Sequence, residues 1–147
     1  MSTSRQITIS YRSILPKDRN IVQKLHEEFF PVKYSASFYD NIIQEKGIHG
    51  GRLHSIMAVD ENDEVIGFML GQFLRYPDQC EDKNLFANPQ PQSLYYILTL
   101  GVSTQYRRYG VASALVQQSI EYSKASPTCG GVSIISISLQ YICTNTF

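Results

Sequence analysis

The segment that most constrains the fold of this chain is an apolar run that leads at once into a short turn and a small-residue helix start. Residues 94–102 are almost all apolar and rich in β-forming side chains, so they predict a buried strand. Arg107 and Arg108 fall in the turn, and Gly110 opens a helix predicted over 110–124. A strand, turn and helix in this order place the N–H groups of a helix start beside the end of a strand.

Two arginines at this position indicate a bound anion. The start of a helix is its positive end, so Arg107 and Arg108 are unfavourably placed there unless a negative group lies between them. Backbone N–H groups and guanidinium groups together bind phosphate well. We therefore predict a site for a phosphate-like ligand. The alternative is an ordinary turn, in which Gly110 serves only the backbone and the arginines are solvated.

The rest of the chain predicts strands and helices around this segment. The first helix carries a stripe of apolar residues at helical spacing: Ile21, Val22, Leu25 and Phe29. The other elements follow from alternation, caps and breakers: a strand over 6–13, a first helix starting at 15–18, a second helix over 38–44, a hairpin of strands 54–60 and 65–74, a long loop over 75–92, and a last strand over 132–142 after breakers at Pro127 and Gly130–Gly131. We expect one α/β domain.

Charge and composition exclude several classes of function. Thirteen basic and thirteen acidic residues balance without a basic cluster, so nucleic acid is not an expected partner. The N-terminus has no apolar signal core, and no apolar run approaches the roughly 20 residues that cross a bilayer. The three cysteines are odd in number and widely spaced, which suits a reducing compartment: Cys80, Cys129 and Cys143. We expect a soluble intracellular protein without a transmembrane segment.

The histidines offer no metal site. They fall in a predicted helix, a loop and a strand start, in no spacing that metal ligands use. Each is expected at the surface rather than in a catalytic role: His26, His49 and His54.

The strand, turn and helix resemble the acetyl-CoA pyrophosphate loop of the GNAT acetyltransferases. That family has Arg or Gln, two residues, Gly, one residue, and then Gly or Ala; Arg107, Gly110 and Ala112 match this pattern. The resemblance implies the GNAT acyl-CoA N-acyltransferase fold, a mixed, mostly antiparallel sheet flanked by helices on both faces. It also implies acetyl-CoA as cosubstrate and no metal.

A second motif resembles the NatF and NatE types of N-terminal acetyltransferase. Phe30–Pro31–Val32, followed by Tyr34, looks like the segment that lines their pocket for the first side chain of the substrate peptide, and residues 96–101 are similar to their fourth strand. The two motifs occur in the same order, and the likeness covers about residues 7–132. From the residues alone, the first motif could also be a hydrophobic staple that packs on the sheet.

The resemblance implies a role for individual residues. Tyr96 would hold the water that receives a proton from the attacking amine, because a tyrosine with a pKa of about 10 is a poor base at neutral pH. The backbone N–H at Leu98 would polarise the thioester carbonyl. Acetyl-CoA would contact Leu98, Leu100, Val102, Arg107, Arg108, Gly110, Val111, Ala112 and Ser113, and the acceptor peptide would contact Phe30, Pro31, Val32, Tyr34 and Tyr96.

The strand that carries Tyr96 also has a simpler interpretation. On a regular strand, Tyr96, Leu98 and Leu100 share one face and Tyr95 lies on the other. Tyr95 and Tyr96 are β-forming aromatic residues, which a sheet favours without any catalytic role.

The resemblance weakens after residue 132. The family continues into a Tyr-Leu-His-Val run whose histidine completes the proton path, and Ile135 stands where that histidine is expected. A further helix and two strands then follow in the family. We therefore expect an incomplete N-acetyltransferase domain over 1–132 and a divergent tail over 133–147. We also expect a cytosolic chain that lacks the membrane-anchoring C-terminus of NatF-type relatives.

The function implied by the resemblance is transfer of acetyl from acetyl-CoA to the N-terminal α-amine of proteins, particularly those that start with Met. Direct attack by the amine needs no covalent enzyme intermediate, and no cysteine here has a nucleophile-like setting. Two alternatives stay open. One is acetylation of lysines, including histone lysines, and the other is a truncated, inactive isoform that binds CoA. The oligomeric state is not determined by the sequence.

Overall fold

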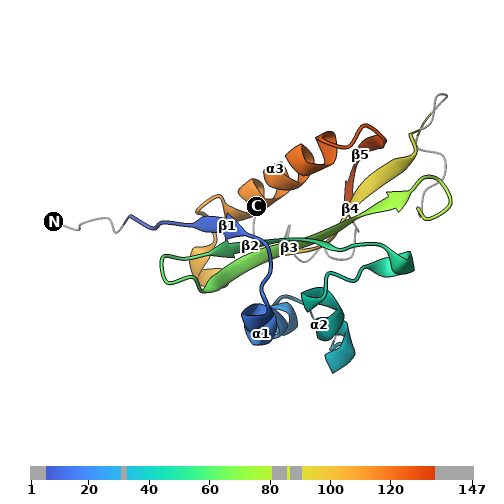
Figure 1. Cartoon of the computed structure of the whole chain (residues 1–147). Coiled ribbons are helices and arrows are strands. Elements are labelled where there is room, and N and C mark those ends of the chain that lie inside the picture. The colour runs from blue at the N-terminus through green and yellow to red at the C-terminus, as the bar shows by residue number, and fades with distance from the viewer. Residues whose placement is uncertain (1–5, 31–32, 81–85, 87–90, 135–147) are drawn as a thin grey trace.

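A computed structural model describes residues 6–30, 33–80, 86 and 91–134. The described strands form a single five-stranded sheet in sequence order, as Figure 1 shows. Its members are β1 (Ser10–Arg12), β2 (His54–Val59), β3 (Val65–Arg75), β4 (Ser93–Val102) and β5 (Cys129–Ile134). The first four strands pair antiparallel, and β5 pairs parallel to β4. The predicted α/β fold with a mixed, mostly antiparallel sheet is confirmed.

Helices cover both faces of this sheet. The helices α1 (Arg19–Phe29) and α2 (Ala36–Ile43) lie on one side, and α3 (Val111–Lys124) crosses the other side (Figure 1). The apolar stripe predicted for the first helix buries Val22 and Leu25 against β2 and β3. On the other face, Leu115 of α3 is completely buried among strand residues. The sheet therefore carries apolar side chains on both faces, as a sheet between two helical layers must.

An ion pair fixes the start of α1. Arg12 of β1 donates two hydrogen bonds to Asp18, at 2.7 and 2.9 Å, and the Asp18 side chain is almost completely buried. Asp18 ends a short 3₁₀ turn over Pro16–Asp18 that precedes the helix. The helix predicted to begin at residues 15–18 thus begins at Arg19, because the residues before it form a separate 3₁₀ turn that contains the proline.

Most predicted boundaries hold to within a few residues, and the hairpin of β2 and β3 is confirmed. The strand predicted over 6–13 is shorter, since only Ser10–Arg12 pairs with β2. Gly130 and Gly131 lie inside β5 and do not break the chain before it. A Cβ at Gly130 would come within 2.4 Å of Pro91, so glycine is required there for close packing. The part of the predicted last strand that follows residue 134 lies outside the described residues.

A β-bulge in β4 changes which of its side chains share a face. The pairing runs Leu70 to Thr99 and then Gly71 to Ile97, so the ladder with β3 passes over Leu98. Tyr96 and Leu98 pack in a cluster near Leu74, whereas Leu100 joins Tyr95 and Ile97 in the core beneath α3. The predicted grouping of Leu100 with Tyr96 and Leu98 is wrong, because the extra residue of the bulge shifts the alternation.

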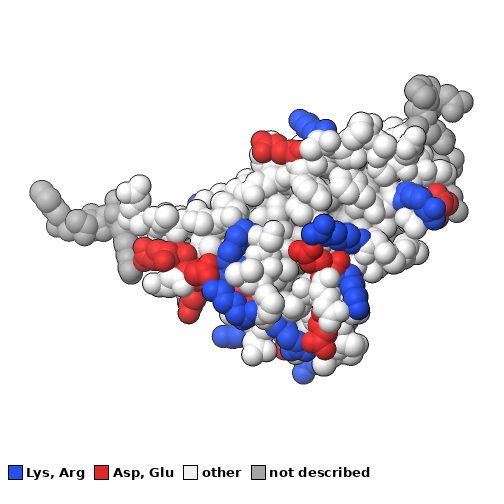
Figure 2. Space-filling view, in the orientation of Figure 1, with Lys and Arg blue, Asp and Glu red and all other residues white. Residues whose placement is uncertain are grey.

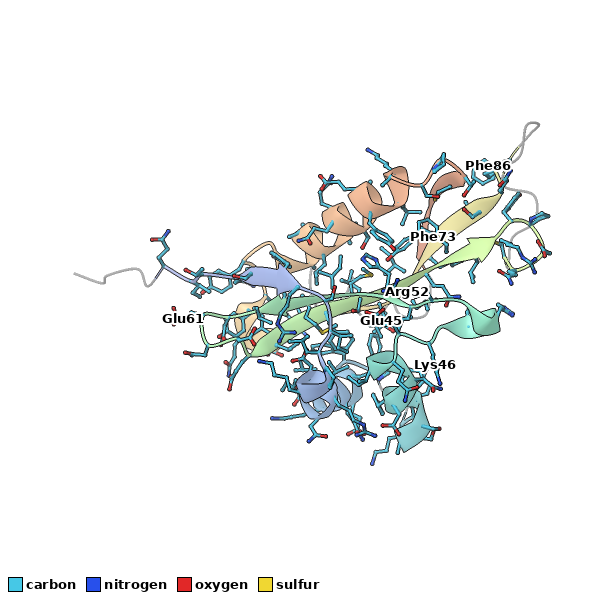
Figure 3. All side chains as sticks on the ribbon, in the orientation of Figure 1. Glu45, Lys46, Arg52, Glu61, Phe73 and Phe86 are labelled. Carbon is cyan, nitrogen blue, oxygen red and sulfur yellow. The ribbon has the colours of Figure 1, made fainter. Side chains whose placement is uncertain are left out.

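Charged side chains of both signs are mixed over α1, α2 and the β2–β3 hairpin, while the visible surface of α3 carries few (Figure 2). At the start of β2, Arg52 donates to Glu45 at 2.8 Å, and Figure 3 shows these two side chains beside each other.

Among the described helices, none combines the length and the apolar character that crossing a membrane requires.

Candidate active site

The segment between β4 and α3 is a tight turn with two left-handed residues. A 3₁₀ turn over Thr104–Tyr106 leads into Arg107, and Arg108 and Gly110 then have φ angles of 72° and 74°. Glycine reaches this region freely, but a residue with a Cβ pays about 1–2 kcal/mol there. The turn therefore holds Arg108 in a backbone conformation that arginine does not favour by itself.

The first backbone N–H groups of α3 point away from the helix body. Gly110 is the N-cap, and the first helical bond runs from the Ala114 N–H to the Gly110 carbonyl at 3.0 Å. The three residues between them precede this bond, so their N–H groups have no carbonyl four residues earlier in the helix. These donors, with the positive end of the helix dipole, favour a negatively charged group.

A pocket of about 200 Å³ lies at this helix start. The end of β4, the turn and the first turn of α3 supply its lining: Val102, Tyr106, Arg107, Arg108, Gly110, Val111, Ala112 and Ser113. All of these except Tyr106 are residues that the resemblance assigns to acetyl-CoA, so the fold brings them together around one concavity. Leu98 and Leu100, the other two assigned residues, lie further back along β4.

The arginines make this pocket positively charged. Arg107 donates from Nε to the Val102 carbonyl at 3.3 Å, which holds its guanidinium against the end of β4. Within the described part of the chain, neither Arg107 nor Arg108 forms an ion pair. Two cations beside a positive helix end repel each other, and an anion bound between them would relieve that repulsion. The donors present fit the diphosphate group of a CoA thioester.

Tyr96 and Leu98 lie where β4 departs from regular pairing. Tyr96 is opposite Gln72 of β3 and Ser133 of β5, and its side chain is only 5% exposed. The bulge separates Leu98 from the β3 ladder, and the described pairing with β5 ends at Ile97. Bulges redirect backbone groups and are common beside active sites. Ile135, which stands where the family's histidine is expected, lies outside the described residues.

The predicted peptide-binding segment begins where α1 ends. Phe30 is the half-buried C-cap of α1, and Tyr34 is 44% exposed and stacks on Phe38 of α2, with ring centroids 4.2 Å apart. Pro31 and Val32 lie outside the described residues. The two described ends of the segment therefore lie beside α1 and α2, in a cluster of aromatic rings.

His26 belongs to this cluster, although the sequence patterns did not indicate it as a site residue. It is 3% exposed, so the expectation that it lies at the surface is wrong. Its ring centroid lies 4.8 Å from that of Phe30 and 5.2 Å from that of Tyr34, and its Nδ1 is 3.2 Å from the Tyr39 hydroxyl. Burial lowers the pKa of His26 to about 4. The sequence contains a signal for this burial, because His26 follows Val22 by four residues on the same helical face.

His54 is also a partner in a hydrogen bond, on the face of the sheet that α3 covers. Its Nδ1 lies 2.6 Å from the hydroxyl of the fully buried Tyr95, and its ring stacks on Tyr122 of α3. Phe73, which Figure 3 shows directed toward α3, packs beside the same rings. His54 is half-buried, so it lies partly at the surface, and His49 is exposed as expected.

Comparisons with known proteins agree that this chain is similar to acetyltransferases. Residues 19–138 match the model of the acetyltransferase (GNAT) family. The chain is 32% identical over 133 residues to histone acetyltransferase MCC1 of Arabidopsis thaliana, covering 85% of this chain and 52% of that protein. It is 26% identical over 117 residues to N-alpha-acetyltransferase 60 of Danio rerio, covering 78% of this chain and 46% of that protein. The chain thus spans about half the length of these relatives.

A solved structure shares the fold described above. The crystal structure of Arabidopsis thaliana NAA60 in complex with acetyl-CoA superposes with a TM-score of 0.73 and 29% identity, over 93% of this chain and 82% of that one. The same protein in complex with a bisubstrate analogue gives a TM-score of 0.74 and 30% identity, over 93% and 83% of the two chains.

Proposed function

The chain belongs to the acetyltransferase (GNAT) family, and we propose that it transfers an acetyl group from acetyl-CoA to the α-amino group at a protein N-terminus. The observation that carries this proposal is the pocket at the start of α3, where two arginines without ion-pair partners among the described residues meet the first N–H groups of the helix. NAA60, which shares the fold, binds acetyl-CoA and a bisubstrate analogue in its crystal structures.

In the proposed reaction, the neutral amine attacks the carbonyl carbon of the thioester. A nitrogen–carbon bond forms, the carbon–sulfur bond breaks, and CoA leaves as the thiol after taking up a proton. Arg107, Arg108 and the N–H groups of α3 hold the diphosphate and thereby orient the thioester along β4. The backbone at Leu98 polarises the carbonyl, and Tyr96 holds the water that removes the amine proton.

An α-amine is a suitable acceptor for a site whose described residues include few acid–base groups. Its pKa of about 7.7–8 leaves roughly a tenth of it neutral at pH 7, whereas less than about a thousandth of lysine, with a pKa of about 10.4, is neutral. Only the neutral amine has the lone pair that attacks. The preference for a Met-starting peptide rests on the apolar character of Phe30 and its neighbours, which disfavours an acidic first side chain.

One observation favours a second acceptor. The relative at 32% identity is named a histone acetyltransferase, which makes lysine side chains the alternative substrate. Two matched peptides separate the alternatives: one has a free Met N-terminus and acetylated lysines, and the other has an acetylated N-terminus and free lysines. We expect faster acetylation of the first. Faster acetylation of the second would establish the lysine acceptor, and CoA binding without turnover of either would establish a binding protein.

The CoA site itself is tested by charge reversal. Arg107→Glu puts a carboxylate where the diphosphate should bind, and we expect CoA affinity in a calorimetric titration to fall by at least about tenfold. Lys124→Glu is the matched control, because it makes the same change in charge at the other end of α3, about 20 Å away. Equal CoA affinities for the two variants would refute the assignment of this pocket.

A further inference from the structure

His26 is buried in a place where an apolar side chain would be easier to accommodate. It lies on α1 among the rings of Phe30, Tyr34, Phe38 and Tyr39, and it is 3% exposed. Burying an imidazole loses its hydrogen bonds to water, and this cost is recovered only through a partner inside the protein. The mechanism proposed above does not use His26, so its burial needs another explanation.

The partner of His26 is the hydroxyl of Tyr39, which is 1% exposed. The hydroxyl lies 3.2 Å from Nδ1 of His26, and this bond joins α1 to α2. Burial raises the pKa of Tyr39 and lowers that of His26, so both groups are neutral at neutral pH and the bond does not depend on charge. A neutral hydrogen bond between two buried side chains fixes both their distance and their orientation.

The ring of His26 also touches both described ends of the predicted peptide-binding segment. Its centroid is 4.8 Å from Phe30, tilted by 50°, and 5.2 Å from Tyr34, nearly edge to face. Tyr34 in turn stacks on Phe38, the neighbour of Tyr39 in α2. One imidazole thus contacts both described ends of the segment, Phe30 at the end of α1 and Tyr34 beside α2.

We propose that His26 is a positioning residue for the acceptor peptide. Its hydrogen bond to Tyr39 and its contacts with Phe30 and Tyr34 hold the Phe30 and Tyr34 side chains in place, and the first side chain of the peptide lies against them. This inference rests on the proposed N-terminal acetyltransferase activity. His26 does not touch the reacting atoms, and it acts on peptide binding through the residues that it supports. Its removal should therefore raise the KM for the peptide and leave the binding of CoA unchanged.

The test compares His26→Phe with Tyr39→Phe and with the double variant. Phenylalanine keeps an aromatic ring at position 26 but cannot share the hydrogen bond, and Tyr39→Phe removes only the hydroxyl. Each single variant should raise the KM for a Met-starting peptide by about fivefold, with kcat and the Kd for CoA within about twofold of wild type. The double variant should be no worse than either single variant, because both break the same bond. His26→Gln, whose amide can accept the bond, should recover part of the effect.

His54→Phe is the matched control, because His54 also shares a hydrogen bond with a buried tyrosine, on the α3 face of the sheet. It should lower the melting temperature without changing the KM for the peptide. An unchanged KM in His26→Phe and Tyr39→Phe, in an enzyme that acetylates the peptide normally, would overturn this inference alone. A wild-type protein that binds CoA but no peptide would overturn both this inference and the proposed function.

Discussion

The buried imidazole of His26 makes the stability of the fold depend on pH in a range where most other groups do not titrate. In the unfolded chain His26 has a pKa of about 6.5, and burial lowers it to about 4 in the native state. Well above pH 6.5 the ring is neutral in both states and has no effect on the free energy of unfolding. As the pH falls from about 6.5 to about 4, the unfolded state takes up a proton that the native state refuses, so the free energy of unfolding decreases.

The size of this effect follows from the two pKa values. Between pH 7 and pH 5 the linkage amounts to about 2 kcal/mol at most, so we expect a loss of about 1–2 kcal/mol. Urea unfolding followed by circular dichroism at the two pH values measures it for the wild type and for His26→Phe. The difference between the proteins isolates His26, because the other titrating groups, including His54, are common to both.

We expect the wild type to lose about 1–2 kcal/mol more than His26→Phe on going from pH 7 to pH 5. A larger loss in the variant, or equal losses in the two proteins, would refute the argument that a neutral imidazole is held in this cluster. A change in the slope of unfolding free energy against urea would indicate that the variant altered the unfolded state instead.

Two further predictions concern β4. Gly101→Ala should destabilise the fold by about 1–3 kcal/mol in urea unfolding, because a Cβ there would come within 2.1 Å of the Phe29 ring of α1. Gly131→Ala is the control and should have little effect, because a Cβ there would have no neighbouring atom within 4 Å. Equal effects of the two substitutions would contradict this packing. Tyr96→Phe should lower kcat by about tenfold to a hundredfold and leave the Kd for CoA unchanged in a titration, and an unchanged kcat would remove Tyr96 from the proton path.

Local patterns in the sequence determined the strand, turn and helix over 94–124, the hairpin of β2 and β3, and the group of residues around the pocket. Arg107, Gly110 and Ala112 are close in sequence, so a tight turn and a helix start are enough to bring them together. Signals of this kind depend on neighbours within a few residues, and a single sequence contains them completely.

The tertiary structure alone decided three other features. The bulge at Leu98 depends on the register with β3, and it places Leu100 beneath α3. Gly130 lies inside β5, where Pro91 occupies the space that a Cβ would take. The spacing of His26 from Val22 already indicates an inward-facing side chain, but only the tertiary structure brings its partners, Tyr39 of α2 and Phe68 of β3, against it. Register and the partners of a buried side chain arise from contacts between different segments, and periodicity within one segment cannot specify them.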